Sequence, residues 1–174
     1  IEKGLYEVRH ETIDLDAVRG IGANPLIQTS AATTITADTF NGNIDIDHAA
    51  GGATTLSSAT TGTGTIAFDQ TGGQSPQVSV ATTTDGNIGI SNVGANLTAL
   101  DVDAGVAGAG DGNVTLSTTT AGDVLVQDVQ APDDLITVNS AAGIEESGAD
   151  AGADITAAMI DLNPANGIGD SAQL

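Results

Sequence analysis

The sequence predicts an all-β chain that folds as a parallel β-helix with coils of about 22 residues. Three observations lead to this prediction. A unit of the Gly-Asn-Ile type returns at a constant interval, apolar and polar residues alternate around each unit, and aromatic residues make up only 2% of the 174 residues. Most globular cores draw much of their buried area from aromatic rings, whereas stacked aliphatic side chains can fill a thin core without them.

The repeating unit begins with a glycine and continues into a short apolar strand. It occupies residues 42–46, 64–68, 86–90 and 112–116, in steps of 22, 22 and 26 residues. The longer step contains the Gly/Ala-rich stretch 104–110, which we interpret as a loop. Because one coil cannot bury its own apolar face, we expect the coils to stack and to form an inner column. Its members are Ile44, Ile66, Ile88, Val114 and Ile136.

A second apolar series lies between these units, so each coil holds two strands. Its members are Ile13, Ile35, Leu56, Val78 and Leu100. Turn residues should stack as well, and Asn amides can hydrogen-bond from coil to coil. We expect this ladder at Asn43, Thr65, Asn87 and Asn113, with Asp123 as a further member. The glycine before each unit is interpreted as the source of the positive φ that a sharp corner needs.

Three alternatives compete with the solenoid. A sandwich of antiparallel hairpins explains the alternation and the turns, but it does not explain the constant spacing. Disorder is favoured by the low aromatic content and the net charge of −20, and it is opposed by the patterned aliphatic residues. Helices are disfavoured because Thr, Val, Ile and Gly are poor helix formers.

A longer repeat suggests how the chain is divided. Residues 13–22 read IDLDAVRGIG and residues 160–169 read IDLNPANGIG, with six of ten positions identical. We therefore expect a lead-in segment or the end of a preceding module at 1–12, one solenoid module at 13–159, and the start of the next module at 160–174. Its partners would be other copies or modules of itself, end to end or side by side.

The charge and the composition exclude several classes of function. The cations are Lys3, Arg9 and Arg19, and no Lys or Arg follows Arg19. Nucleic-acid binding is excluded, because it requires cations that displace counterions, and anionic membranes are disfavoured for the same reason. No apolar run reaches the ~20 residues of a transmembrane helix. The absence of Cys excludes disulfides and thiolate metal sites.

A resemblance to known proteins rests on three features. These are the Gly-Asn-Ile-x-Ile units, the Thr-Thr-Thr units and the Asn-Gly-Ile-Gly corner at 166–169. They resemble the large bacterial exoproteins of the filamentous haemagglutinin type and giant tandem-repeat surface proteins. The resemblance implies a right-handed parallel β-helix that is exported to the cell surface and serves as a stalk, sheath, coat or adhesin. Those families have no catalytic residues to carry over. A glycan-binding adhesin module is the alternative function, although Phe40 and Phe68 are interpreted as interior or corner fillers.

Enzyme activity is not expected. Polysaccharide lyases of this shape pair acidic calcium ligands with a basic residue, and none follows Arg19. Hydrolases use clustered carboxylates. Here Asp45 aligns instead with Ala67, Gly89, Thr115 and Thr137 on the neighbouring coils. The Thr runs begin at uneven intervals, which does not suit the flat outer array of an ice-binding solenoid.

Calcium is the one cofactor that the sequence indicates. Five aspartates offer the hard oxygen ligands that Ca²⁺ takes. They are Asp101, Asp103, Asp111, Asp133 and Asp134. Neither the EF-hand spacing nor the glycine-rich nonapeptide is present, so a solvated acidic face is the alternative. His10 and His48 have no second His or Cys nearby, and we expect both at the surface or in turns rather than at a zinc site.

Overall fold

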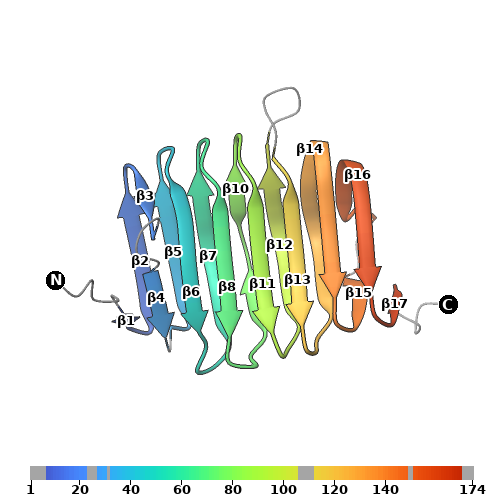
Figure 1. Cartoon of the computed structure of the whole chain (residues 1–174), viewed down its shortest axis with the longest axis horizontal. Coiled ribbons are helices and arrows are strands. Elements are labelled where there is room, and N and C mark those ends of the chain that lie inside the picture. The colour runs from blue at the N-terminus through green and yellow to red at the C-terminus, as the bar shows by residue number, and fades with distance from the viewer. Residues whose placement is uncertain (1–6, 23–26, 31, 106–111, 149–150, 170–174) are drawn as a thin grey trace.

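The computed structural model describes residues 7–22, 27–30, 32–105, 112–148 and 151–169. These residues contain strands and turns but no helix, and they form a β-solenoid of about seven turns. Successive coils lie about 22 residues apart, as the sequence predicts. Every strand pairing among them is parallel, and the coils follow one another along the long axis (Figure 1).

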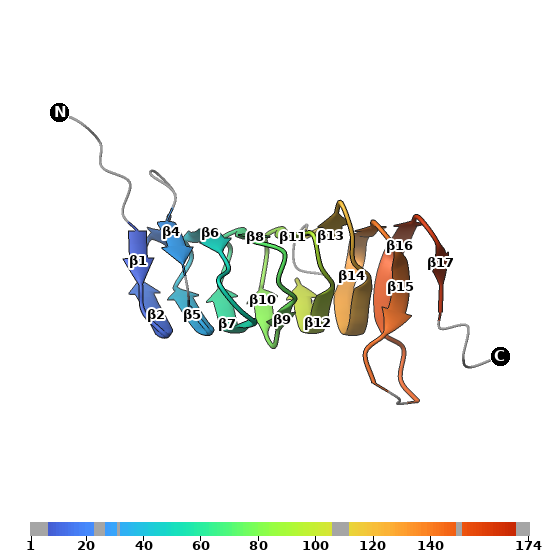
Figure 2. The ribbon, with the colours of Figure 1, turned by 90° about the horizontal axis from the view of Figure 1, so that it is seen from below.

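Each coil crosses two facing layers (Figure 2). The first layer consists of β2 (Thr12–Ala17), β5 (Thr34–Thr39), β7 (Thr54–Thr61), β9 (Pro76–Val78), β10 (Ala81–Thr83), β12 (Leu97–Ala104), β15 (Gly143–Glu146) and β17 (Gly167–Ile168). The second layer consists of β1 (Glu7–Arg9), β3 (Gly20–Ile21), β4 (Ile27–Ser30), β6 (Asn43–Ala49), β8 (Ile66–Thr71), β11 (Ile88–Val93) and β13 (Val114–Thr119). Two longer strands, β14 (Val124–Ser140) and β16 (Ile155–Pro164), pass from the first layer into the second.

The predicted inner column runs through the second layer. Ile44 pairs with Ile66, Ile66 with Ile88, Ile88 with Val114, and Val114 with Ile136. All five side chains are at most 1% exposed. The core is therefore a narrow stack of aliphatic side chains between the two layers, in which the period-2 alternation of each strand turns alternate residues inward.

The column of the first layer departs from the prediction at one position. Ile35 pairs with Leu56 and Leu56 with Val78, but Val78 pairs with Ala99 instead of Leu100. Ala99 is fully buried, whereas Leu100 is only partly buried. The step from Val78 to Ala99 is 21 residues, one fewer than the usual 22, and a slip of one residue exchanges the inner and outer faces of a strand.

The two matching decapeptides lie in different layers. Ile13 pairs with Ile35 in the first layer, whereas Ile160 pairs with Ile136 in the second. A whole number of coils therefore does not separate them. Strand β16 also runs without interruption through the predicted boundary between residues 159 and 160. The division into modules itself stays a prediction.

Candidate functional site

The predicted asparagine ladder occupies the corner that leads into the second layer. The Oδ1 atom of Asn43 accepts a hydrogen bond from the Thr65 amide at 3.1 Å, and that of Asn87 accepts one from the Asn113 amide at 2.9 Å. The Oδ1 atom of Asn113 accepts one from the Leu135 amide at 3.2 Å. The side chains therefore tie successive coils together, as predicted.

Asp123 belongs to a different ladder, at the opposite corner. Its amide donates to Oδ1 of Asn96 at 2.9 Å, and its own Oδ1 accepts from the Gly143 amide at 2.7 Å. The placement of Asp123 in the Asn43 ladder was wrong because Asp123 precedes a strand of the first layer, whereas Asn113 precedes one of the second.

The glycine of each unit has a steric role instead of the predicted positive φ. Gly42, Gly64, Gly86 and Gly112 are not among the residues with positive φ. A Cβ on Gly64 would lie 2.3 Å from the Gly42 carbonyl oxygen, and one on Gly86 would lie 2.2 Å from that of Gly64. The backbones of successive corners are thus too close for any side chain.

Threonine hydroxyls satisfy these glycine carbonyls from inside the solenoid. Oγ1 of Thr61 donates to the Gly42 carbonyl and Oγ1 of Thr83 to the Gly64 carbonyl, both at 2.9 Å. Thr61 is 7% exposed and Thr83 is 4% exposed. Both Thr61 and Thr83 therefore point inward and close the corner.

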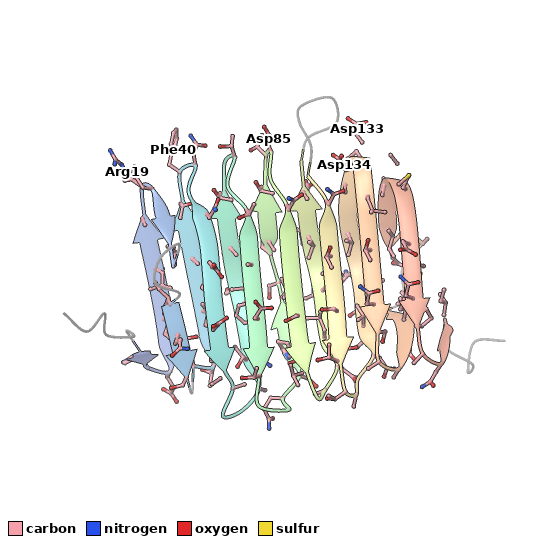
Figure 3. All side chains as sticks on the ribbon, in the orientation of Figure 1. Arg19, Phe40, Asp85, Asp133 and Asp134 are labelled. Carbon is pink, nitrogen blue, oxygen red and sulfur yellow. The ribbon has the colours of Figure 1, made fainter. Side chains whose placement is uncertain are left out.

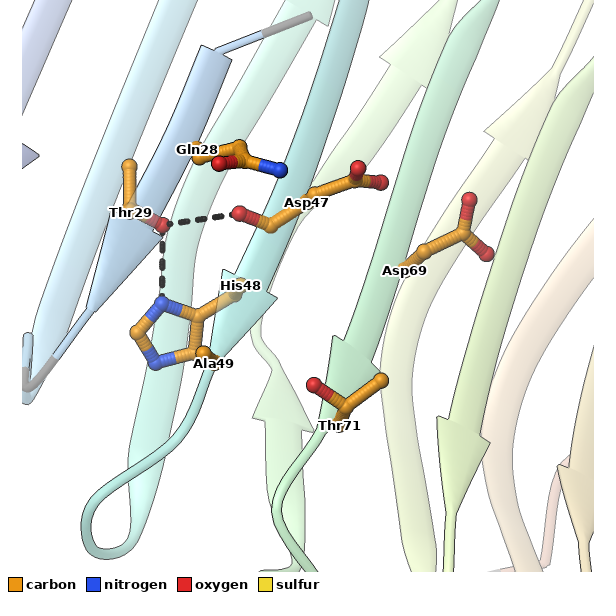
Figure 4. A pocket seen from close by; sticks show the side chains of 7 residues that line it. All are labelled: Gln28, Thr29, Asp47, His48, Ala49, Asp69 and Thr71. Carbon is orange, nitrogen blue, oxygen red and sulfur yellow. Dashed lines mark hydrogen bonds between the residues drawn. The ribbon is translucent and has the colours of Figure 1, made fainter. Parts of the chain in front are cut away.

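His48 lies inside the solenoid, which corrects its predicted place at the surface. It is 1% exposed, and its Nδ1 lies 2.8 Å from Oγ1 of Thr29 (Figure 4). Its Nε2 lies 3.0 Å from Oγ1 of Thr54. Because the Thr54 hydroxyl donates to the Ala32 carbonyl at 3.1 Å, Nε2 is the donor of its pair and Nδ1 accepts from Thr29. The ring also stacks on Phe68, with the ring centroids 6.3 Å apart.

Burial lowers the pKa of His48, and a hydrogen bond to the backbone of Thr29 acts in the opposite direction. A cavity of about 300 Å³ opens beside the ring and is also lined by Asp47 and Asp69 (Figure 4). Both ring nitrogens are used by internal hydrogen bonds, so the arrangement resembles a structural cross-link more than a general base. His10, in contrast, is exposed as expected.

His48 is one member of a buried polar column that the sequence reasoning missed. The column contains Thr29, His48, Gln70, Asn92, Thr118 and Ser140, all at most 6% exposed. The sequence contains a signal for this column, because each of its residues from His48 onward follows a member of the inner column by four positions. These side chains close the second corner; for example, Nδ2 of Asn92 donates to the Ala95 carbonyl at 2.8 Å.

The predicted calcium ligands do not form one cluster. Asp101 and Asp103 lie on the outer face of β12, where Asp101 pairs with Asp128 on β14. Asp133 and Asp134 lie at a corner (Figure 3), and Oδ2 of Asp134 accepts from the Gly112 amide at 2.9 Å. Asp111 is outside the described residues.

Within the described ranges, no group of three or more His, Asp or Glu side chains is arranged to hold a metal ion. Calcium binding stays a prediction. Burial, followed by the charge of Asp128, raises the pKa of Asp101. Burial, followed by the charges of Asp101 and Asp128, raises the pKa of Asp103, whose Oδ1 is buried without a hydrogen-bond partner.

The outer face of the second layer carries a further group of carboxylates. Asp45 aligns with Ala67 as expected, and the register continues to Gly89, Thr115 and Thr137. Burial raises the pKa of Asp45, and the charges of Asp47 and Asp69 raise it further. This part of the face is therefore a site of mutual repulsion at neutral pH.

The two phenylalanines occupy different environments. Phe68 is 1% exposed and fills the core, as predicted. Phe40 lies at a corner but is 75% exposed, so the interpretation of Phe40 as a filler was wrong. The corner turn projects its side chain outward (Figure 3).

At the C-terminal end of the stack, the last apolar side chains of the core columns are exposed to solvent. Ile160 follows Ile136 in the inner column but is 49% exposed, and Ile168 follows Ile144 but is 60% exposed. Met159 is 63% exposed. Strand β16 pairs with β14 on one edge, and no described strand pairs with its other edge. We call this surface, made by β16 and β17, the C-terminal face.

Comparisons with protein-family models, with curated proteins and with solved structures found no match. The likeness to filamentous haemagglutinin-type exoproteins therefore stays an expectation from the sequence. Among the described residues there is no helix of the length and apolarity needed to cross a membrane.

Proposed function

We propose that the chain is a structural, non-catalytic module of a long extracellular fibre, stalk, sheath or coat, and that a further coil covers its C-terminal face. The observation that carries this proposal is the exposure of Ile160 and Ile168 at the ends of columns whose other members are buried. An unpaired strand edge beside an apolar surface favours the addition of another strand. A parallel coil of the same kind satisfies both the edge and the columns.

The remaining features support a structural role. Ladders of Asn and Thr side chains join each coil to the next along the axis, and the glycine corners let the coils approach closely. The net charge of −20 keeps such a rod soluble, and it makes the sides of neighbouring rods repel each other. The resemblance to exported surface exoproteins points in the same direction.

The experiment measures association of the isolated chain as a function of concentration. We expect self-association through the C-terminal face, detected by sedimentation velocity. Ile160→Asp should abolish it, because a carboxylate would be buried in an apolar contact. Thr115→Asp is the control: it adds the same charge at an exposed position in the middle of the stack and should leave association intact.

Two results would contradict the proposal. One is a chain that stays monomeric at all concentrations with its C-terminal face protected from hydrogen exchange. The other is an equal effect of the two substitutions, which would show that net charge and not the C-terminal face controls association.

A further inference from the structure

Two large apolar side chains are exposed far from the C-terminal face. Val18 is 76% exposed and Phe40 is 75% exposed, on consecutive coils. Together with Asp16 and Asp38 they line a groove of about 360 Å³ on the outer corner of the first layer. Axial stacking of coils would leave this groove open, because it lies on the side of the solenoid.

The groove is built by the same short pattern on two coils. Asp16 pairs with Asp38 and Ala17 with Thr39, which places Val18 and Phe40 next in line. On the following coil, Thr60 takes the place of the aspartate, and Gly62 comes where the apolar side chain stood. The groove thus has two carboxylates on one side and two apolar side chains on the other.

The charge and the side chains of the groove indicate which kind of ligand it could bind. Two carboxylates on a chain of net charge −20 repel an anion and attract a cation. An exposed aromatic ring offers a flat face to the C–H groups of a sugar ring and to an ammonium group. We propose that this groove binds an amino sugar with a free, protonated amine, such as a unit of a deacetylated hexosamine polymer. This inference is independent of the proposed structural function.

The two carboxylates give the amine a defined place. The Thr60 hydroxyl donates to Oδ1 of Asp38, which fixes the orientation of that carboxylate. The strands that carry Asp16 and Asp38 lie ~4.8 Å apart along the axis, a step similar to the length of one sugar residue. A polymer lying along the axis would therefore present successive units to the two coils.

Arg19 indicates which of the two carboxylates the amine should contact. It follows Val18 and is exposed at the same corner (Figure 3). Its positive charge disfavours an amine near the first coil, so the amine should sit beside Asp38. Arg19→Gln should then strengthen binding of the charged sugar.

The test uses the full chain and two probes, a deacetylated chito-oligosaccharide and its N-acetylated counterpart, with binding followed by NMR shifts at a pH where the free amine is charged. We expect binding of the deacetylated probe only. Phe40→Ala should weaken it about 2- to 30-fold, the range of a cation–π contact, and Asp38→Asn should weaken it as well. Asp85→Asn is the matched control, because Asp85 is exposed at the same corner two coils further along (Figure 3).

Several outcomes would overturn the inference. Equal affinity for the two probes would exclude recognition of the amine. Equal losses for Asp38→Asn and Asp85→Asn, with none for Phe40→Ala, would show general attraction to an acidic surface. Self-association that Phe40→Ala abolishes, without any sugar binding, would show that the groove takes a second copy of the chain.

Discussion

The two ends of the solenoid present the same kind of column to different surroundings. Ile13 and Ile21 are the first members of their columns and are 3% and 4% exposed, whereas Ile160 and Ile168 at the other end are 49% and 60% exposed. The residue type is the same, so the difference lies in what covers it. The apolar columns are therefore covered at the N-terminal end, which we call closed, and exposed at the C-terminal end, which we call open. The outermost strands β2 and β16 each have an edge that no described strand pairs with. We therefore expect the isolated chain to associate through one end only, giving pairs instead of long fibres.

Truncation of an isoleucine at each end tests this comparison most directly. Ile21→Ala removes a buried side chain that pairs with Ile44, and we expect a loss of about 2–5 kcal/mol in the free energy of unfolding. Ile160→Ala should cost far less in the monomer, because its side chain is half exposed. Urea unfolding followed by circular dichroism measures both, and equal losses would show that the C-terminal end is closed in solution.

Replacement of glycine by alanine should also have different effects on stability at the two ends. A Cβ on Gly42 would lie 1.9 Å from the Arg19 carbonyl oxygen, whereas one on Gly167 would meet nothing within 4 Å. Gly42→Ala should cost about 3 kcal/mol, the upper end of the usual range for overpacking. Gly167→Ala should be tolerated by the monomer. Thermal unfolding of both variants gives the comparison, and a destabilised Gly167→Ala monomer would contradict it.

Mild acid should weaken the coils around His48 near the closed end. Burial lowers the pKa of His48 from its ordinary value of 6.5, so the unfolded chain binds a proton before the folded chain does. Its contribution to stability is therefore present above pH 6.5 and is lost as the pH falls from there to the lowered pKa of the folded state. Hydrogen exchange at pH 7 and pH 5.5 should show this loss of protection, and His48→Gln should remove it.

The aspartates with raised pKa act with the opposite sign. Asp45, Asp101 and Asp103 take up protons more readily in the folded chain than in the unfolded one. Their unfavourable contribution at neutral pH is relieved as the pH falls through their raised pKa values towards 3.8. Asp101→Asn should therefore stabilise the chain at pH 7 and have less effect at pH 4. An equal effect at both pH values would contradict this assignment.

The smallest expected effect concerns a corner in the half of the chain nearer the open end. Thr120 has a φ of 70°, although it is β-branched, and Gly94 on the preceding coil has a φ of 90°. Thr120→Gly should relieve about 1 kcal/mol of backbone strain. Thermal unfolding measures the gain, with Thr119→Gly as the control, since Thr119 lies in β13 without such a φ and should only be destabilised.

Constant spacing made the inner column predictable. Ile44, Ile66 and Ile88 are large, aliphatic and 22 residues apart, and a stacked coil is the simplest way to bury them. The choice of Leu100 over Ala99 was wrong because this step is one residue shorter than the 22 that was assumed. Burial of His48 was not predicted because the polar column changes residue type between coils, from Thr29 to His48 to Gln70, and so forms no recurring motif.

The candidate sites were less predictable than the fold. Asp101 and Asp133 are both acidic and near in sequence, but one lies on a sheet face and the other at a corner, so spacing alone could not show whether they meet. Phe40 and Phe68 share a residue type, and only the local turn decides which of them points outward. Both cases depend on the direction of a side chain at a corner, where the alternation of the strands no longer applies.

The orientation of the hydrogen bonds between coils has a mechanical consequence. Neighbouring coils are joined by parallel ladders in both layers, and the bonds of such ladders lie across the strands and therefore along the long axis. A tensile load along the axis is shared by all the bonds between two coils, which must fail together. A sideways pull on a terminal strand such as β17 loads one bond at a time, so a solenoid that resists stretching would peel apart from an uncovered end.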